Sequence, residues 1–221
     1  MHKVVNNLLS IQSEINLKIK QLNIKNYNPN IIAVTKTFTA KDIFPLINHG
    51  HFHFGENKVQ EAVEKWVNIK NDFKHIKLHM IGKLQTNKVK YAVSLFDYIH
   101  SLDNIKLAEK VSKEQSKNNK KLKLFIQVNI GNESQKSGIL VNQLDSFYNK
   151  CTKDLDLNII GLMCLPPNES KSSIYFSQMQ ELIKKIPLNE ISMGMSSDYL
   201  DALKYKSTYL RIGSKIFNNR N

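Results

Sequence analysis

Short apolar runs alternate with longer segments of helical hydrophobic period along the whole chain. The apolar runs predict eight β-strands, at residues 31–35, 52–54, 77–81, 98–100, 123–130, 158–163, 190–193 and 208–212. The segments between them keep apolar side chains on one helical face and predict helices at residues 40–48, 57–68, 87–95, 104–118, 141–152, 172–185 and 198–204. A further helix, over about residues 3–23, precedes the first strand.

Strands that alternate with helices through short connections imply parallel strands joined by right-handed crossovers. Two α/β architectures fit this order, a closed (β/α)8 TIM barrel and an open doubly wound sheet. Eight strands favour the barrel, with the additional N-terminal helix in front of it. The first strand–helix unit also lacks the GxGxxG signature of a dinucleotide-binding sheet. No internal repeat or long linker interrupts the pattern, so we predict a single domain over residues 1–221.

Length and composition agree with one soluble domain. A chain of 221 residues that is 41% hydrophobic can bury one substantial core but is short for two domains. No apolar stretch reaches the 18 residues expected of a transmembrane helix, and the first residues resemble neither a signal peptide nor a transit peptide. Cys151 and Cys164 lack metal-type or redox-type spacing. We therefore expect a reducing, cytoplasmic location and no membrane partner.

A formal net charge of +13 raises the question of nucleic-acid binding. Only Arg211 and Arg220 among the 32 basic residues are arginine, the side chain best suited to planar recognition of phosphates and bases. The lysines are spread along the chain, with one cluster in segment 113–123 whose role the sequence leaves open. The pattern favours weak electrostatic attraction at low salt over a specific nucleic-acid site.

Lys36 stands where the first predicted strand meets polar residues. An ammonium at the carboxyl end of a buried strand loses hydration, which costs free energy unless the group has a partner or a chemical role. The same desolvation favours the neutral amine, which is the form that attacks a carbonyl to make an imine, or Schiff base. We therefore expect Lys36 to be desolvated and to react with an aldehyde.

Small residues follow the last two predicted strands, at 192–196 and 211–214. In TIM barrels, the loops after the seventh and eighth strands commonly bind phosphate. The backbone of Gly213 allows close approach to a ligand, and Ser196 and Ser214 add hydroxyl donors. Ordinary turn formation is the alternative for each loop alone. Their paired position favours a phosphate site, and with Lys36 a phosphorylated aldehyde.

Other polar residues near strand ends have two interpretations each. Arg211 can face the ring nitrogen of a heteroaromatic cofactor and keep it unprotonated, or it can form a structural salt bridge. Asn57 can orient an imine or a ring hydroxyl near Lys36, or it can cap the following helix. His79 is a pocket residue or, more simply, a core or surface histidine. The group His49, His51 and His53 lacks accompanying carboxylates or cysteines, so no metal site is predicted.

With these residues in view, the chain resembles the YggS/PROSC family of pyridoxal phosphate homeostasis proteins, whose barrel is similar to the alanine racemase N-terminal domain. The resemblance covers nearly the whole chain. Its blocks are 33–37, 54–61, 79–88, 127–130 with 136–138, 161–167, 192–198 and 211–214. Departures are small: Lys58 stands where an aromatic residue is usual, Ser214 replaces a threonine, and Asn218 replaces a glycine.

The resemblance implies that the chain binds pyridoxal 5'-phosphate as its cofactor. By that likeness Lys36 holds the cofactor as an internal aldimine, Arg211 faces the pyridine nitrogen, and the phosphate is held by Ser196, Gly213 and Ser214. Four further residues match positions that line the family's cofactor pocket, namely Asn57, His79, Met163 and Met193. The implied role is intracellular cofactor homeostasis that affects amino-acid balance, with no catalytic residue assigned.

Two other functions stay open. A pyridoxal-phosphate-dependent amino-acid racemase needs acid/base groups on both faces of the substrate carbon. Lys36 can serve one face, whereas the four candidates for the other, Tyr175, Tyr199, Tyr205 and Tyr209, have no obvious placement for it. A sugar-phosphate-binding barrel explains the last two loops but gives Lys36 no role unless it forms an imine there too. Possible partners are amino acids and pyridoxal-phosphate-dependent enzymes, and a monomer is expected.

Overall fold

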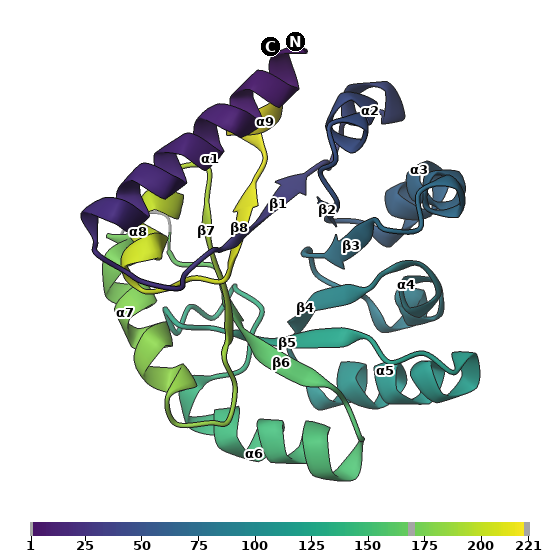
Figure 1. The fold of residues 1–221 in the computed structure, drawn as a ribbon. Coiled ribbons are helices and arrows are strands. Elements are labelled where there is room, and N and C mark those ends of the chain that lie inside the picture. Colours follow the sequence, from purple (N-terminus) through teal and green to yellow (C-terminus); the bar gives the residue numbers. More distant parts are fainter. Residues whose placement is uncertain (1, 168–170, 219–221) are drawn as a thin grey trace.

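Eight parallel strands, each hydrogen-bonded to the next in sequence, close into a barrel because β8 also pairs with β1 (Figure 1). The structure is a computed structural model that describes residues 2–167 and 171–218. The strands are β1 (Asn30–Val34), β2 (His53–Glu56), β3 (Lys77–Met80), β4 (Tyr98–Leu102), β5 (Lys123–Val128), β6 (Ile159–Cys164), β7 (Glu190–Met195) and β8 (Tyr209–Ile212). The predicted TIM barrel is confirmed, and all eight predicted strands occur with their ends shifted by no more than two residues.

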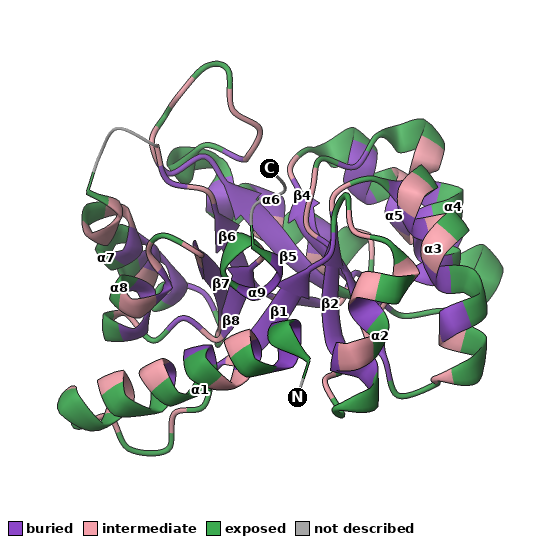
Figure 2. Ribbon diagram, turned by 90° about the horizontal axis from the view of Figure 1, so that it is seen from above, coloured by how far each residue is buried: buried purple, intermediate pink, exposed green. Residues whose placement is uncertain are grey.

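Helices follow the strands and surround the barrel. They are α2 (Ala40–Asn48), α3 (Val59–Asp72), α4 (Val89–Leu95), α5 (Ile105–Asn118), α6 (Leu144–Asn149), α7 (Ser172–Ile183), α8 (Tyr199–Lys204) and α9 (Ser214–Phe217). Figure 2 shows the strands buried at the centre and the outer helix faces exposed. Because helices cover one side of each strand and barrel side chains fill the other, nearly every strand position is buried.

The N-terminal helix α1 (Lys3–Gln21) is present as predicted and lies against α8, α9 and α2 (Figure 1). Its buried residues Val4, Leu8, Ile11 and Ile15 recur at helical spacing and form its inner face. The Asn7 side-chain amide donates to the carbonyl of Ile216 at 2.8 Å. Helix α1 therefore supports α9, which follows the last strand. Among the described residues, none of the helices combines the length and apolar character needed to span a membrane.

Two helical segments differ from the prediction. The segment predicted as one helix over 141–152 contains a 3-10 turn (Val141–Gln143), α6 and a π-helical turn (Lys150–Asp154). These helix types share a similar hydrophobic spacing, so the sequence pattern does not separate them. The four-residue α9 was not predicted, because one turn is too short to show a period. The single domain over residues 1–221 stays a prediction.

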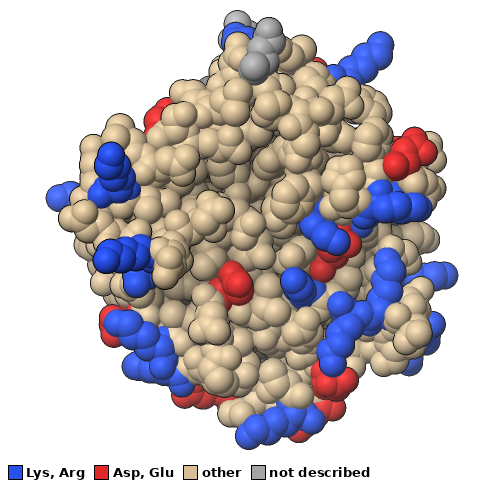
Figure 3. Space-filling view, viewed as in Figure 1, with Lys and Arg blue, Asp and Glu red and all other residues tan. Residues whose placement is uncertain are grey.

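Basic side chains do not form one continuous stripe on the face shown in Figure 3, where acidic groups lie among them. Part of the lysine-rich segment 113–123 is paired with carboxylates. Lys117 lies 3.7 Å from Glu114, and Lys121 lies 3.3 Å from Asp156. Both partners of the Lys121–Asp156 pair are exposed, so this pair contributes about 0–1 kcal/mol to stability. The two pairs lower the local positive charge that a nucleic acid would meet.

Candidate cofactor site

A cavity of about 830 Å³ opens at the carboxyl ends of the strands. Residues at or following the ends of seven of the eight strands contribute to its wall, as expected for the loop face of a TIM barrel. The lining residues are Val34, Lys36, Asn57, Ile81, Gly82, Lys83, Gln127, Val128, Asn129, Gln135, Lys136, Ser137, Leu165, Met195, Ser196, Ser197, Arg211, Gly213 and Ser214. Six of the nine predicted site residues are among them: Lys36, Asn57, Ser196, Arg211, Gly213 and Ser214.

Lys36 lines this cavity but is exposed, so the expectation of a desolvated lysine is wrong. Strand β1 ends at Val34, and Thr35 rather than Lys36 occupies the last buried position. The following residue, Thr37, has a φ of +66°. A β-branched residue seldom adopts this left-handed conformation, which costs about 1–2 kcal/mol. Such strain persists where the surrounding structure fixes it, often beside a functional group.

A buried cluster beneath Lys36 fixes the end of β1. The Thr35 hydroxyl donates to Glu56 Oε1 at 2.7 Å, and Trp66 Nε1 donates to the same oxygen at 2.8 Å. Lys65 Nζ donates to Glu56 Oε1 and to the Thr35 carbonyl, both at 2.8 Å. No role was predicted for Glu56. A glutamate closing an apolar strand just before a helix with Lys65 and Trp66 was the available signal.

Asn57 follows β2 and lines the cavity without capping a helix, because the N-cap of α3 is Lys58. Gly82 packs directly against the backbone of Asn57. A Cβ atom at Gly82 would lie only 2.3 Å from the Asn57 carbonyl oxygen. The absence of a side chain at Gly82 therefore allows the loops after β2 and β3 to meet at the cavity.

Arg211 in β8 is 4% exposed and forms no salt bridge with the described residues, in contrast to the structural alternative. Its Nη1 donates to Ser192 Oγ at 2.6 Å and its Nη2 to the carbonyl oxygen of Cys164 at 2.8 Å. Burial lowers the pKa of Arg211 from its ordinary value, and charge interactions with Cys164 and Asp198 act in the opposite direction. A buried guanidinium with uncharged partners favours an additional acceptor from a ligand in the cavity.

The predicted phosphate residues converge at one end of the cavity. Ser196 Oγ accepts from the backbone amide of Gly213 at 3.2 Å and from that of Lys215 at 3.5 Å. Ser196, Gly213 and Ser214 all line the cavity wall. The two loops after β7 and β8 thus bring hydroxyls and backbone N–H groups together, which are suitable donors for an anion.

The other three predicted site residues are not among the lining residues. His79, Met163 and Met193 are each 0% exposed and lie in the barrel core. His79 forms hydrogen bonds with two other histidines inside the barrel, and burial lowers its pKa well below the ordinary value. In the part of the chain that the structure describes, no three histidine, cysteine or carboxylate side chains are grouped in a way that suits a metal ion.

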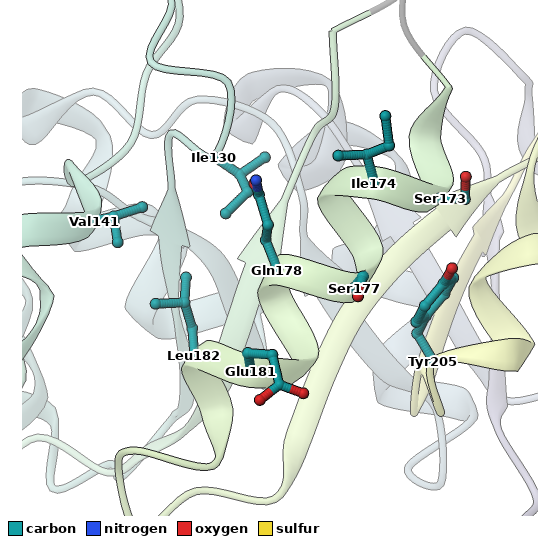
Figure 4. A pocket seen from close by; sticks show the side chains of 9 residues that line it. All are labelled: Ile130, Val141, Ser173, Ile174, Ser177, Gln178, Glu181, Leu182 and Tyr205. Atoms are coloured by element: carbon teal, nitrogen blue, oxygen red, sulfur yellow. The ribbon is translucent and has the colours of Figure 1, made fainter.

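A second cavity, of about 770 Å³, lies beside α7 (Figure 4). Ile130, Ile174 and Leu182 give it a largely apolar wall, and Tyr205 forms another side. Its acidic residue Glu181 is paired with Lys184 at 2.6 Å. No lysine is among its described lining residues, so it offers no amine for an aldehyde.

The geometry of the first cavity agrees with the comparison to known proteins. A family model described as alanine racemase, N-terminal domain, matches residues 12–220. The chain belongs to this family. The alanine racemase of Bartonella henselae has the same fold, with 14% identity, a TM-score of 0.68 and coverage of 95% of this chain and 62% of the racemase.

More similar members of the alanine racemase N-terminal domain family confirm the resemblance found in the sequence. The pyridoxal phosphate homeostasis protein of Haemophilus influenzae is 32% identical over 228 residues, covering 99% of this chain and 96% of that protein. Its counterpart in Aquifex aeolicus is 34% identical over 199 residues, covering 86% of each. The structure of PipY from Synechococcus elongatus with pyridoxal phosphate bound is 32% identical, with a TM-score of 0.78 and coverage of 92% and 99%.

Proposed function

We propose that this protein binds pyridoxal 5'-phosphate in the 830 Å³ cavity and acts in cofactor homeostasis. One observation supports this most directly: an amine, a buried guanidinium and two anion-binding loops line one cavity. The relatives that cover nearly the whole chain are named for pyridoxal phosphate homeostasis, and PipY holds the cofactor. When bound, pyridoxal phosphate supplies an aldehyde that a lysine amine captures with loss of water.

Each group of the proposed site has one task. Lys36 Nζ would hold the aldehyde carbon. Arg211 would face the ring nitrogen with the N–H groups that have no acceptor among the described residues. Ser196, Gly213 and Ser214 would hold the phosphate. Asn57 orients the polar groups next to Lys36. Partnership with amino acids or with pyridoxal-phosphate-dependent enzymes, the monomeric state and the cytoplasmic location stay predictions.

The described lining residues favour holding the cofactor over racemisation. They include no tyrosine, histidine, aspartate or glutamate, so no such group stands ready to move a proton on the face opposite Lys36. Of the candidate tyrosines, Tyr205 lines the other cavity, Tyr199 bonds to Glu14 and Tyr209 lies in the barrel core. A sugar-phosphate site would leave the amine of Lys36 without a role.

Absorbance spectroscopy tests the proposal. Protein mixed with pyridoxal phosphate and freed of excess cofactor should show a visible band from the captured aldehyde, and Lys36→Ala should abolish it. Lys83→Ala is the matched control, because Lys83 lines the same cavity. A protein that takes up no cofactor would overturn the proposed function. Loss of the band in Lys83→Ala with retention in Lys36→Ala would overturn the assignment of Lys36.

A further inference from the structure

Five side chains from five strands form one hydrogen-bonded chain across the barrel interior. His53 Nδ1 lies 2.8 Å from His79 Nε2, and His79 Nδ1 lies 3.0 Å from His100 Nε2. His100 Nδ1 lies 2.9 Å from Ser192 Oγ, which accepts from Arg211 Nη1 at 2.6 Å. The chain therefore runs from β2 through β3, β4 and β7 to the cavity wall at β8.

The members of this chain are buried and held by packing. His79, His100 and Ser192 are each 0% exposed, while His53 at the far end is 8% exposed. The ring of His79 stacks on Tyr98 with centroids 4.1 Å apart, and that of His100 stacks on Phe125 at 4.2 Å. Burial lowers the pKa of all three histidines, so the rings are neutral near neutral pH.

Arg211 sets the direction of the hydrogen bonds. A guanidinium only donates, so Ser192 Oγ accepts from it and keeps one hydrogen for His100 Nδ1. His100 then carries its hydrogen on Nε2 and donates to His79, which donates from Nε2 to His53 in the same way. The reversed chain would leave the Ser192 hydroxyl hydrogen without an acceptor among the described residues, which is costly for a buried donor.

This direction turns the lone-pair end of every dipole towards Arg211. Aligned neutral dipoles offset a buried positive charge, and successive hydrogen bonds polarise one another. The second described acceptor of Arg211, the Cys164 carbonyl, is also uncharged. A carboxylate partner would instead compete with a ligand for the guanidinium N–H groups.

We propose that Ser192, His100, His79 and His53 are positioning residues, which hold Arg211 as an unpaired cation facing the cofactor ring through a one-directional hydrogen-bonded chain. The inference rests on the proposed function for the cofactor's identity. The hydrogen-bonded chain of side chains is present in the protein without cofactor. It gives His79 a role in the site although His79 does not line the cavity.

Nitrogen-15 NMR of the cofactor-free protein tests the direction of the chain. Three histidines should be neutral and carry their hydrogen on Nε2, and the nitrogen-15 chemical shift of Nδ1 should be that of a hydrogen-bond acceptor. The variants His79→Phe and His100→Phe assign two of these three sets of signals. Hydrogen on Nδ1 of His79 or His100 would overturn the inference. This measurement does not depend on cofactor binding, so it separates the two proposals.

Cofactor titration tests the action on Arg211. Ser192→Ala should raise the dissociation constant of pyridoxal phosphate about tenfold, or about 1.4 kcal/mol, and shift the absorbance maximum of the bound cofactor. His79→Phe, two hydrogen bonds further away, should raise it about threefold with a shift of the same sign. Ser192→Thr keeps the hydroxyl and should restore the spectrum.

Phe125→Leu is the matched control, because it removes a ring stacked on His100 and leaves the hydrogen-bonded atoms in place. A merely structural role for the chain would make Phe125→Leu as harmful as His79→Phe and would leave the absorbance maximum unchanged. Unchanged affinity and spectrum in Ser192→Ala, with normal cofactor uptake by the unsubstituted protein, would overturn the positioning role alone. Absence of uptake by the unsubstituted protein would overturn the proposed function instead.

Discussion

The buried ion pair of Lys65 with Glu56 should be among the most sensitive sites of the barrel. The Lys65→Met substitution keeps most of the side-chain volume and removes the ammonium. The Lys65 side chain is 11% exposed and that of Glu56 is 0% exposed. The substitution therefore leaves a carboxylate inside the protein without its cation, and it removes the Lys65 donor to the Thr35 carbonyl.

Removing one partner of a buried ion pair costs about 3–5 kcal/mol, because the remaining charge is uncompensated. Two donors to Glu56 Oε1 persist in the variant, from Thr35 and Trp66, which favours the lower end. Glu56 Oε2 has no hydrogen-bond partner among the described residues and adds no compensation. We expect a loss of about 3 kcal/mol in the free energy of unfolding, or about 6–12 °C in the midpoint temperature.

Urea denaturation of Lys65→Met, Glu56→Gln and the double variant measures this loss and the coupling between the two residues. Lys70→Met is the matched control. Lys70 lies 2.6 Å from Asp97, but these side chains are 19% and 30% exposed, so solvent weakens the pair. The double variant should be more stable than the sum of the single losses predicts. Strict additivity, or a Lys65→Met loss no larger than that of Lys70→Met, would refute the reasoning.

Three further outcomes are expected. Burial lowers the pKa of His51 and of His53 from 6.5 to about 4. Between these two pH values only the unfolded chain binds the protons, so the free energy of unfolding should fall as the pH drops from 6.5 towards 4, by roughly 3 kcal/mol for His51. Urea denaturation midpoints across this pH range measure the loss. A Gly82→Ala variant should weaken cofactor binding by about tenfold or more in a titration, since its Cβ would collide with the Asn57 carbonyl; unchanged affinity would mean that this contact does not shape the cavity. Any duplex DNA binding should show a steep loss between low and physiological salt in a fluorescence-anisotropy assay, and binding that resists salt would contradict a purely electrostatic origin.

The sequence was sufficient for the barrel because several strands, such as β1, β5 and β6, are apolar runs closed by polar or small residues. A strand that is buried on both faces is apolar whichever strands lie beside it. Its position can therefore be predicted from the local sequence pattern alone. The placement of the loops after β7 and β8 followed from the strand count. The position of Lys36 at the cavity followed in the same way.

The burial of individual side chains at strand ends could not be obtained from the sequence. Thr35 and Lys36 are adjacent, and burial ends between them, so an error of one residue in the predicted end of the strand changes which of the two is exposed. The contacts of His79 were equally hidden. Its partners come from β2 and β4, and the serine that completes the chain lies 92 residues beyond His100. Hydrogen bonds between such distant residues leave no periodic trace in the chain.

The charges that line the cavity favour binding of an anionic cofactor more than catalysis with it. Lys36, Lys83, Lys136 and Arg211 are cationic, and the described lining residues include no carboxylate. Of these four, Lys136 is the one that forms an ion pair within the described part of the chain, with Glu133 at 2.6 Å. Such a wall attracts an anion strongly. It lacks a tyrosine, histidine or carboxylic acid, which are groups more acidic than lysine that could return a proton to a substrate carbon. If Arg211 is balanced by neutral dipoles instead of a carboxylate, its full charge stays directed at the ring nitrogen. That charge disfavours protonation of the ring and so weakens its capacity to accept electrons. The same feature that favours retention of the cofactor therefore works against catalysis with it.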